Sequence, residues 1–154
     1  AEKIGKLNVK FDIILHFELI EHLNNPISFM NAIYENLFDG GYVIFTTPNS
    51  LGLEIKALGY NKTRLLAHSI FPPMHLNAFS TENILLFANK NNFKLKSIET
   101  PGILDIDILS LVSDEIEDEN LYEITNMNED IKAYFQFLTS YLNSSSHMRV
   151  VFEK

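Results

Sequence analysis

A strand, helix, strand order in the first third of the chain constrains its fold more than any other feature. Residues 11–15 form a short, almost continuously apolar run, which predicts a strand covered on both faces. Asn25 and Pro26 then supply an N-cap and a first-turn proline, and the helix that they begin is expected to end at Gly40-Gly41. A second apolar strand is predicted over residues 42–47. Connections of this length join parallel strands through a crossover helix, so the order indicates an α/β sheet.

Further elements are predicted along the rest of the chain. They are a short helix at residues 53–58, a helix capped by Ser80, a strand at residues 93–99, a long helix at residues 121–142 and a final strand at residues 147–153. Apolar side chains recur at helical spacing along the long helix, which predicts a stripe that faces the core. The region between the second strand and Ser80 is long and irregular, and loops of that length are often functional.

The acidity of the chain is concentrated in one region. The net charge is -8, and the stretch between Lys96 and Lys132 contains many Asp and Glu residues but no Lys or Arg. We expect residues 103–130 to form an acidic insertion with a solvated surface. Because a basic stripe with interleaved aromatic residues is also missing, nucleic-acid binding is not expected.

Composition limits the class of protein further. The chain has 154 residues, a length that fits one compact unit, and it has no cysteine, which excludes disulfides and thiolate metal sites. No apolar run approaches the ~20 residues that span a bilayer, and the first residues do not resemble a secretion signal. We therefore expect a cytoplasmic protein without membrane insertion.

The run Phe17-Glu18-Leu19-Ile20-Glu21-His22 follows the first predicted strand directly. One helical turn would place the side chains of Glu18, Glu21 and His22 on one side, because residues three and four apart are neighbours on a helix. Carboxylates at such a point favour Mg²⁺, and imidazoles also suit Mn²⁺, Fe²⁺ or Zn²⁺. The alternative is that the glutamates only cap or pair at the following turn.

The order of these residues resembles the C-terminal half of a class I S-adenosylmethionine-dependent methyltransferase. The resemblance rests on an ordered set of segments: Phe11-Asp12-Ile13-Ile14, Glu18-x-x-Glu21-His22, Asn25-Pro26, Leu37-Phe38-Asp39-Gly40-Gly41-Tyr42-Val43-Ile44, Thr47-Pro48-Asn49, His75-x-x-x-Phe79-Ser80 and Asn92-Phe93. It implies half of a Rossmann-like methyltransferase sheet, mostly parallel with one antiparallel strand and with helices on both faces. By the same resemblance, the last strand would run antiparallel between the family's fifth and sixth strands.

The sequence departs from this family where the cofactor binds. The family's first strand ends in a glycine-rich loop beside the cofactor, and its second strand ends in an acid that binds ribose. None of the six glycines here sits in a glycine-spaced turn after a strand. Residues 1–154 are therefore expected to be a partial domain that lacks three strands and is inactive alone, or a half-domain that another chain completes.

A narrower resemblance suggests roles for individual residues. Ubiquinone-type O-methyltransferases and small-RNA 2′-O-methyltransferases share a Glu-x-x-Glu-His run that binds a divalent cation. This implies that Glu18, Glu21 and His22 are metal ligands and that His75 is a fourth metal ligand or a base that binds the acceptor. His75 and Glu21 would be the catalytic residues. It also implies that His16, Phe17 and Glu18 contact S-adenosylmethionine, although His16 equally fits a place in the core. The RNA enzymes carry a second late histidine that this chain lacks.

Other polar residues leave alternatives open. Asn49, at the end of the second predicted strand, either touches the acceptor or forms a turn. Tyr60, Lys62 and Arg64, with Phe71 nearby, form a patch that either binds a phosphate or carboxylate of an acceptor or is simply solvated.

Two functions follow as expectations. The first is methylation of a hydroxyl group on a small molecule with S-adenosylmethionine as the donor. The second is a non-catalytic module that pairs through the exposed edge of its first strand, for example as a homodimer.

Overall fold

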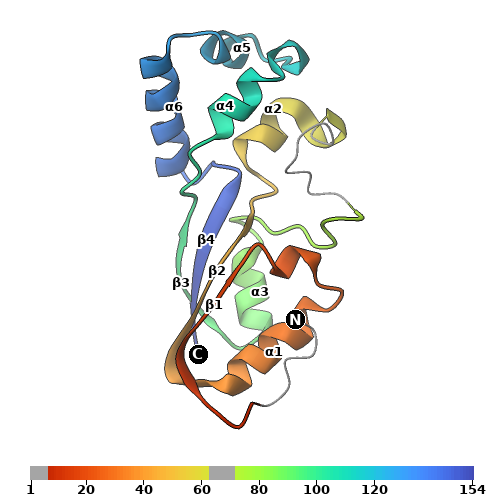
Figure 1. Cartoon of the computed structure of the whole chain (residues 1–154), viewed down its shortest axis with the longest axis vertical. Helices are drawn as coiled ribbons and strands as arrows, with labels where there is room; N and C mark the ends of the chain where they lie inside the picture. Colours follow the sequence, from red (N-terminus) through yellow and green to blue (C-terminus); the bar gives the residue numbers. More distant parts are fainter. Residues whose placement is uncertain (1–6, 63–71) are drawn as a thin grey trace.

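Four strands form one mixed sheet in the computed structural model, which describes residues 7–62 and 72–154. The spatial order is β1 (Phe11–Phe17), β2 (Leu37–Pro48), β4 (His147–Glu153) and β3 (Lys94–Glu99). β1 and β2 are parallel, and β4 is antiparallel to both of its neighbours (Figure 1). The predicted strands and the single antiparallel strand between β2 and β3 are therefore confirmed, although only the β1–β2 pairing is parallel. No described helix is long and apolar enough to cross a membrane.

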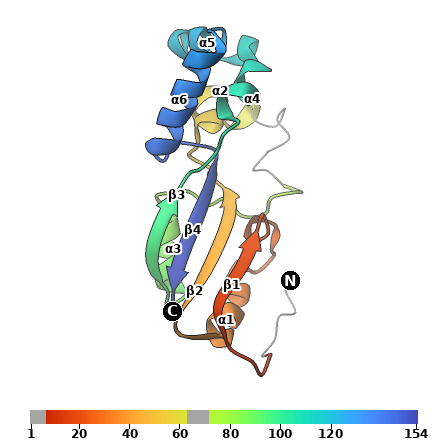
Figure 2. The same cartoon turned by 60° about the vertical axis from the view of Figure 1, so that its left-hand side comes forward.

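Two helices, α1 (Pro26–Asn36) and α3 (Ile84–Lys90), pack on the same face of the sheet (Figures 1 and 2). The side chain of Asn25 accepts a hydrogen bond from the Ser28 amide, as expected of an N-cap before a first-turn proline. Apolar side chains from the helices and from the facing side of the sheet form the main core, which includes Phe29, Met30, Ile33, Val43, Phe45, Ile84, Met148, Val150 and Phe152. This core holds the strand ends in fixed positions.

The opposite face of the sheet is uncovered within the described residues. Ile13, Leu15 and Phe17 are 54%, 56% and 58% exposed, whereas their neighbour His16 is buried. The expected helices on both faces are therefore absent from the described chain, and the prediction that β1 is covered on both sides is wrong here. The physical reason is that alternate side chains of a strand point to opposite faces, and α1 and α3 both lie on one of them.

The helix that begins at Pro26 ends at Asn36, four residues before the glycine pair that was expected to end it. Gly40 and Gly41 lie inside β2 instead. A Cβ on Gly41 would lie 2.9 Å from the carbonyl oxygen of Phe38 and 3.0 Å from that of Asp12, so the close approach of β1 requires glycine. Gly40 has a φ of +79°. The two glycines are therefore part of the irregular pairing of β1 with β2, and they do not end a helix.

A group of short helices lies beyond the end of the sheet where β2 stops and β4 starts (Figure 1). It contains α2 (Leu53–Lys62), α4 (Asp105–Ser110), α5 (Glu119–Thr125) and α6 (Glu129–Tyr141), and Leu58, Leu109 and Ile116 form its small core. Short 3₁₀ turns lie at Ile20–His22 and Ser113–Glu115. The predicted short helix at residues 53–58 is confirmed within α2.

The predicted single helix over residues 121–142 is wrong, because the chain breaks between α5 and α6. Asn128 caps α6 by accepting a hydrogen bond from the Ile131 amide, and this competes with a continuous helix. Tyr134 and Tyr141, two of the positions expected in the core, are 65% and 75% exposed. The helical spacing was real, but no described element covers that side of α6.

Asp105 fixes the helical group to the sheet. Its carboxylate is 2% exposed and accepts hydrogen bonds from the amide of Ser146 at 2.6 Å, the hydroxyl of Ser145 at 2.5 Å and the side-chain amide of Gln136 at 2.8 Å. These contacts join the start of α4 to α6 and to the residues before β4. Three hydrogen bonds to one buried side chain therefore connect the helical group to the sheet at this junction.

Candidate functional site

The chain leaves β1 through a sharp turn that carries Glu21 into the interior. Glu18 has a φ of +46°, an unusual value for a residue with a side chain, and the 3₁₀ turn Ile20–His22 follows. Glu21 is 1% exposed, and its Oε2 accepts a hydrogen bond from Thr47 Oγ1 at 3.0 Å. The other oxygen, Oε1, is buried and has no hydrogen-bond partner among the described residues. Burial raises the pKa of Glu21.

The loop after residue 72 is hydrogen-bonded to this turn. The amides of Leu76 and Asn77 donate to the carbonyl of Glu21 at 2.8 and 3.0 Å, and the Asn77 side chain donates to the carbonyl of Leu23 at 2.7 Å. This arrangement brings His75 beside His22, with 4.7 Å between their ring centroids. Asn77 is thus a positioning residue that sequence reasoning missed, since no motif or spacing marks it.

Glu21, His22 and His75 form a compact group, which we call the Glu-His-His cluster. Each side chain offers one ligand atom, and these atoms lie within 4.8 Å of one another. His22 Nδ1 donates a hydrogen bond to the carbonyl of Met74, and in this tautomer of the neutral ring Nε2 is the nitrogen with a lone pair. That Nε2 lies 3.6 Å from Glu21 Oε1. An oriented imidazole beside an unpartnered buried carboxylate oxygen fits a divalent cation.

Glu18 lies apart from this cluster. It precedes the 3₁₀ turn, so the single helical turn that would align it with Glu21 and His22 does not form. Its carboxylate instead lies 3.3 Å from His147 Nε2 at the start of β4. Burial opposes ionisation of Glu18, but hydrogen bonds from His147 and Thr46 outweigh it and lower the pKa of Glu18. The structure thus brings together three of the four predicted ligands, and a ligand role for Glu18 stays a prediction.

Residues 1–98 match the protein family described as "Methyltransferase domain". The chain belongs to the class I S-adenosylmethionine-dependent methyltransferases. Over 49 residues, it is 35% identical to the ubiquinone biosynthesis O-methyltransferase of Ruegeria pomeroyi, a match that covers 32% of this chain and 20% of that relative. The chain therefore matches about a fifth of the length of this curated relative.

Solved structures agree with this methyltransferase domain at the level of the fold. A methyltransferase from Archaeoglobus fulgidus superposes with a TM-score of 0.54 at 15% identity, over 94% of this chain and 60% of that one. Phosphoethanolamine N-methyltransferase 2 of Haemonchus contortus superposes with a TM-score of 0.52 at 18% identity, over 94% of this chain and 33% of that one. The family implies S-adenosylmethionine as the cofactor.

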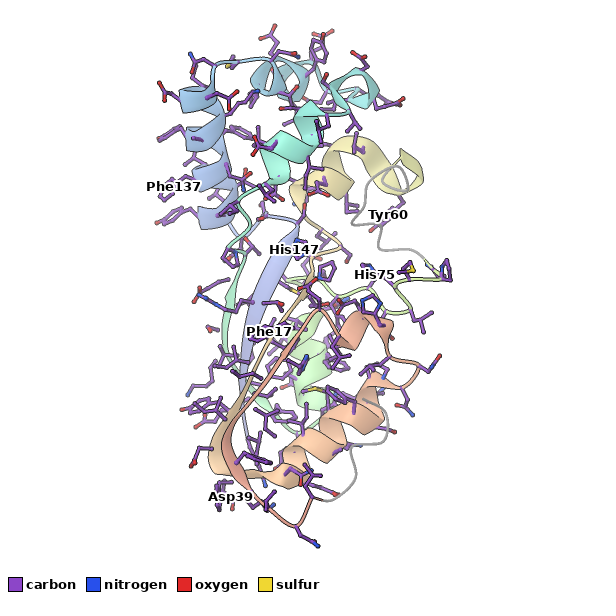
Figure 3. The ribbon with its side chains drawn as sticks, viewed as in Figure 1. Phe17, Asp39, Tyr60, His75, Phe137 and His147 are labelled. Atoms are coloured by element: carbon purple, nitrogen blue, oxygen red, sulfur yellow. The ribbon has the colours of Figure 1, made fainter. Side chains whose placement is uncertain are left out.

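Within the methyltransferase domain, the residues predicted to contact the cofactor point in different directions. His16 lies in the core, with its ring 4.8 Å from that of Phe45 and 5.2 Å from that of Phe29. Phe17 projects from the uncovered face of the sheet (Figure 3). The place of His16 agrees with the core alternative, whereas cofactor contacts by His16, Phe17 and Glu18 stay predictions.

The remaining candidates are Asn49 and the patch around Tyr60, and the structure describes only part of that patch. Asn49 is 1% exposed, donates to the carbonyl of Ser145 at 2.9 Å and accepts from the amide of Leu51 at 3.2 Å, so the turn-forming alternative describes its contacts. Tyr60 is exposed. Arg64 and Phe71, together with the side chain of Lys62, lie outside the described residues.

His16 should make the methyltransferase domain sensitive to acid. Burial lowers the pKa of His16 from 6.5 to about 4, and neither ring nitrogen has a hydrogen-bond partner among the described residues. Between these pH values the unfolded chain binds a proton that the folded chain does not. The free energy of unfolding should therefore fall by about 3 kcal/mol as the pH falls from 6.5 to about 4.

Urea unfolding across this pH range measures the effect. The free energy of unfolding of the His16→Leu variant should fall less over this pH range. His147→Gln is the matched control, because the hydrogen bond with Glu18 raises the pKa of His147 and its contribution is lost as the pH rises. The prediction would be contradicted if the free energy of unfolding depended on pH equally steeply in the unmodified chain and in His16→Leu.

Proposed function

We propose that this chain is the acceptor-side part of an S-adenosylmethionine-dependent O-methyltransferase that acts on a hydroxyl group of a small molecule. The observation that carries the proposal is the Glu-His-His cluster beside the ends of β1 and β2. The match to ubiquinone biosynthesis O-methyltransferases supports oxygen as the acceptor atom, since it includes relatives named for that reaction.

Methyl transfer from a sulfonium is an in-line substitution that needs an oriented acceptor and a route for its proton. In the absence of a bound cation, we assign the acceptor's proton to His75, because it lies on the loop side of the cluster and is only partly buried. With a cation bound, His75 would instead be one of its ligands. Glu21 is held from two sides, by Thr47 and by the loop, and so can orient its neighbours. S-adenosylmethionine supplies the methyl group when it is bound.

A divalent cation is part of the proposal. Glu21, His22 and His75 would hold it, because their ligand atoms converge and Glu21 Oε1 has no other described partner. Such an ion would lower the pKa of a bound hydroxyl group. Mg²⁺ fits the carboxylate, and Mn²⁺, Fe²⁺ or Zn²⁺ fit the two imidazoles better.

The proposal includes a source for the cofactor side of the enzyme outside residues 1–154. β1 pairs only with β2 among the described residues, so its outer edge is free, and Ile13, Leu15 and Phe17 are exposed next to it. We propose that further strands, from a longer polypeptide or from a second chain, pair with this edge and bring the glycine-rich loop. Residues 1–154 would then be inactive alone.

The free edge also favours a second candidate function. An uncovered strand with apolar neighbours binds other strands, so the chain could act as a non-catalytic module that forms a homodimer. The two candidates differ in whether S-adenosylmethionine binds once the edge is paired.

Calorimetric titration with S-adenosylmethionine tests the main proposal. Residues 1–154 should give no binding heat, whereas the same residues preceded by those that the gene encodes upstream should bind with a dissociation constant on the order of micromolar. Binding by residues 1–154 alone would contradict the need for a second half. No binding by either polypeptide would favour the interaction module.

The metal proposal is tested by Mn²⁺ titration followed by electron paramagnetic resonance. Glu21→Gln should weaken Mn²⁺ binding by about tenfold or more, because it removes the charged ligand. Glu35→Gln, at an exposed acid on α1, is the matched control and should bind like the unmodified chain. Equal Mn²⁺ affinities for the two variants would contradict the metal proposal. Full activity of the longer enzyme in excess chelator would also contradict it.

Edge pairing is tested by sedimentation of residues 1–154 over a range of concentrations. We expect self-association, and Leu15→Lys should weaken it because a charge on an edge strand blocks strand addition. Leu111→Lys is the matched control, since Leu111 is also exposed but lies away from the sheet. A monomer at all concentrations, or equal effects of both lysines, would contradict pairing through β1.

A further inference from the structure

A second group of polar residues lines a cavity of about 260 Å³ between the sheet and the helical group. Its walls come from the start of α2, the loop before α4, α4 itself and the start of β4. The lining residues are Glu54, Pro101, Gly102, Ile103, Leu104, Asp105, Ile108 and His147. Neither the family match nor the cluster accounts for this cavity.

The cavity is formed in advance by a rigid loop. The carbonyl of Gly102 accepts hydrogen bonds from Ser140 Oγ at 2.6 Å and from Gln136 Nε2 at 2.8 Å. A Cβ on Gly102 would lie only 1.7 Å from Ser145 Oγ, so glycine allows the loop to approach the residues before β4. Pockets that exist before a ligand arrives are typical of binding sites for small molecules.

The two buried acids of the cavity have different contacts. Asp105 already accepts the three hydrogen bonds that fix the helical group. Glu54 is 4% exposed, and the hydrogen bond found for its carboxyl group is one with Ser146. Burial, and then the charge of Asp105, raise the pKa of Glu54 to about 7. Glu54 is therefore a buried acid whose charge is poorly compensated.

The charges of the lining residues select the kind of ligand. Among the described lining residues the ionisable side chains are Glu54, Asp105 and His147, with no Lys or Arg, so a phosphate or carboxylate would meet two acids and one imidazole there. His147 Nε2 lies 3.3 Å from the carboxylate of Glu18, so the charge of this imidazole is paired with Glu18. The apolar side chains of Ile103, Leu104 and Ile108 suit a hydrocarbon skeleton. In the described residues, the Glu-His-His cluster is the only group arranged to hold a metal, so the acids of the cavity point to an organic cation.

We propose that this cavity binds the ammonium-bearing end of the acceptor, a protonated amine on a short apolar skeleton, with the Glu54 carboxylate as its partner. The atom to be methylated would then lie toward the Glu-His-His cluster, because Glu18, three residues before Glu21 in the chain, lies 3.3 Å from His147 in the cavity wall. The inference rests on the proposed function only in naming the ligand as an acceptor.

Titration of the ¹⁵N-labelled chain with three single-ring probes tests the proposal. Cyclohexylamine should shift the amide resonances of Glu54, Gly102 and His147. Cyclohexanol should bind about tenfold more weakly, since it lacks the charge that pairs with Glu54, and cyclohexanecarboxylate should not bind.

Two variants and a control complete the experiment. Glu54→Gln keeps the shape of the side chain and should weaken the amine by about tenfold. Ile108→Trp should fill the cavity and exclude every probe, whereas Glu35→Gln should leave all affinities unchanged. Equal binding of amine and alcohol, unchanged amine binding by Glu54→Gln, or no binding at all would overturn the proposal. No step involves methyl transfer, so this proposal and the proposed function can fail separately.

Discussion

β2 pairs with β1 in parallel and with β4 in antiparallel register, which places Phe17 opposite Thr46 and Pro48 opposite His147. The last residues of β1, the last residues of β2 and the first residues of β4 therefore lie at the same end of the sheet. Four polar side chains near the site come from this end of the sheet. Glu18 and Glu21 follow β1, Thr47 lies in β2 and His147 begins β4.

Hydrogen bonds to backbone carbonyls join the turn and the loop of the site. Two amides of the loop after residue 72 donate to one carbonyl, that of Glu21, and the Asn77 side chain donates to that of Leu23. Each buried bond of this kind contributes about 1 kcal/mol, and losing a partner leaves a buried polar group that costs more. The turn and the loop therefore constrain each other. His75 approaches His22 as a consequence of this constraint.

The sequence was sufficient for features that depend on neighbouring residues. The N-cap at Asn25, the strands at residues 42–47 and 147–153, and the short helix after residue 53 all follow from local patterns, and the structure confirms them. The family resemblance added the antiparallel place of β4. These elements could be predicted because capping, alternation and apolar runs act over a few residues.

The features that failed depend on contacts across the chain. An apolar run such as residues 11–15 predicts that these side chains are buried, but it does not identify the element that covers them. The glycine pair looked like a helix end because its real constraint, the approach of Asp12 in β1, is distant in sequence. The stripe on α6 had helical spacing without a described covering element. Asn77 had no signal, since its partners are carbonyls of residues more than fifty positions away.

Burial of polar groups near the strand ends reads as a functional arrangement rather than as a stabilising one. His16 has two unpartnered nitrogens, and Glu21 has one unpartnered oxygen, among the described residues. Apolar residues of similar size would avoid these desolvation costs, so stability alone does not explain an acid at the position of Glu21. The desolvation costs of His16 and Glu21 can be relieved in different ways. His16 can stay neutral between two aromatic rings, whereas Glu21 faces two imidazoles that a cation would join to it. A bound cation would stabilise the second arrangement and not the first.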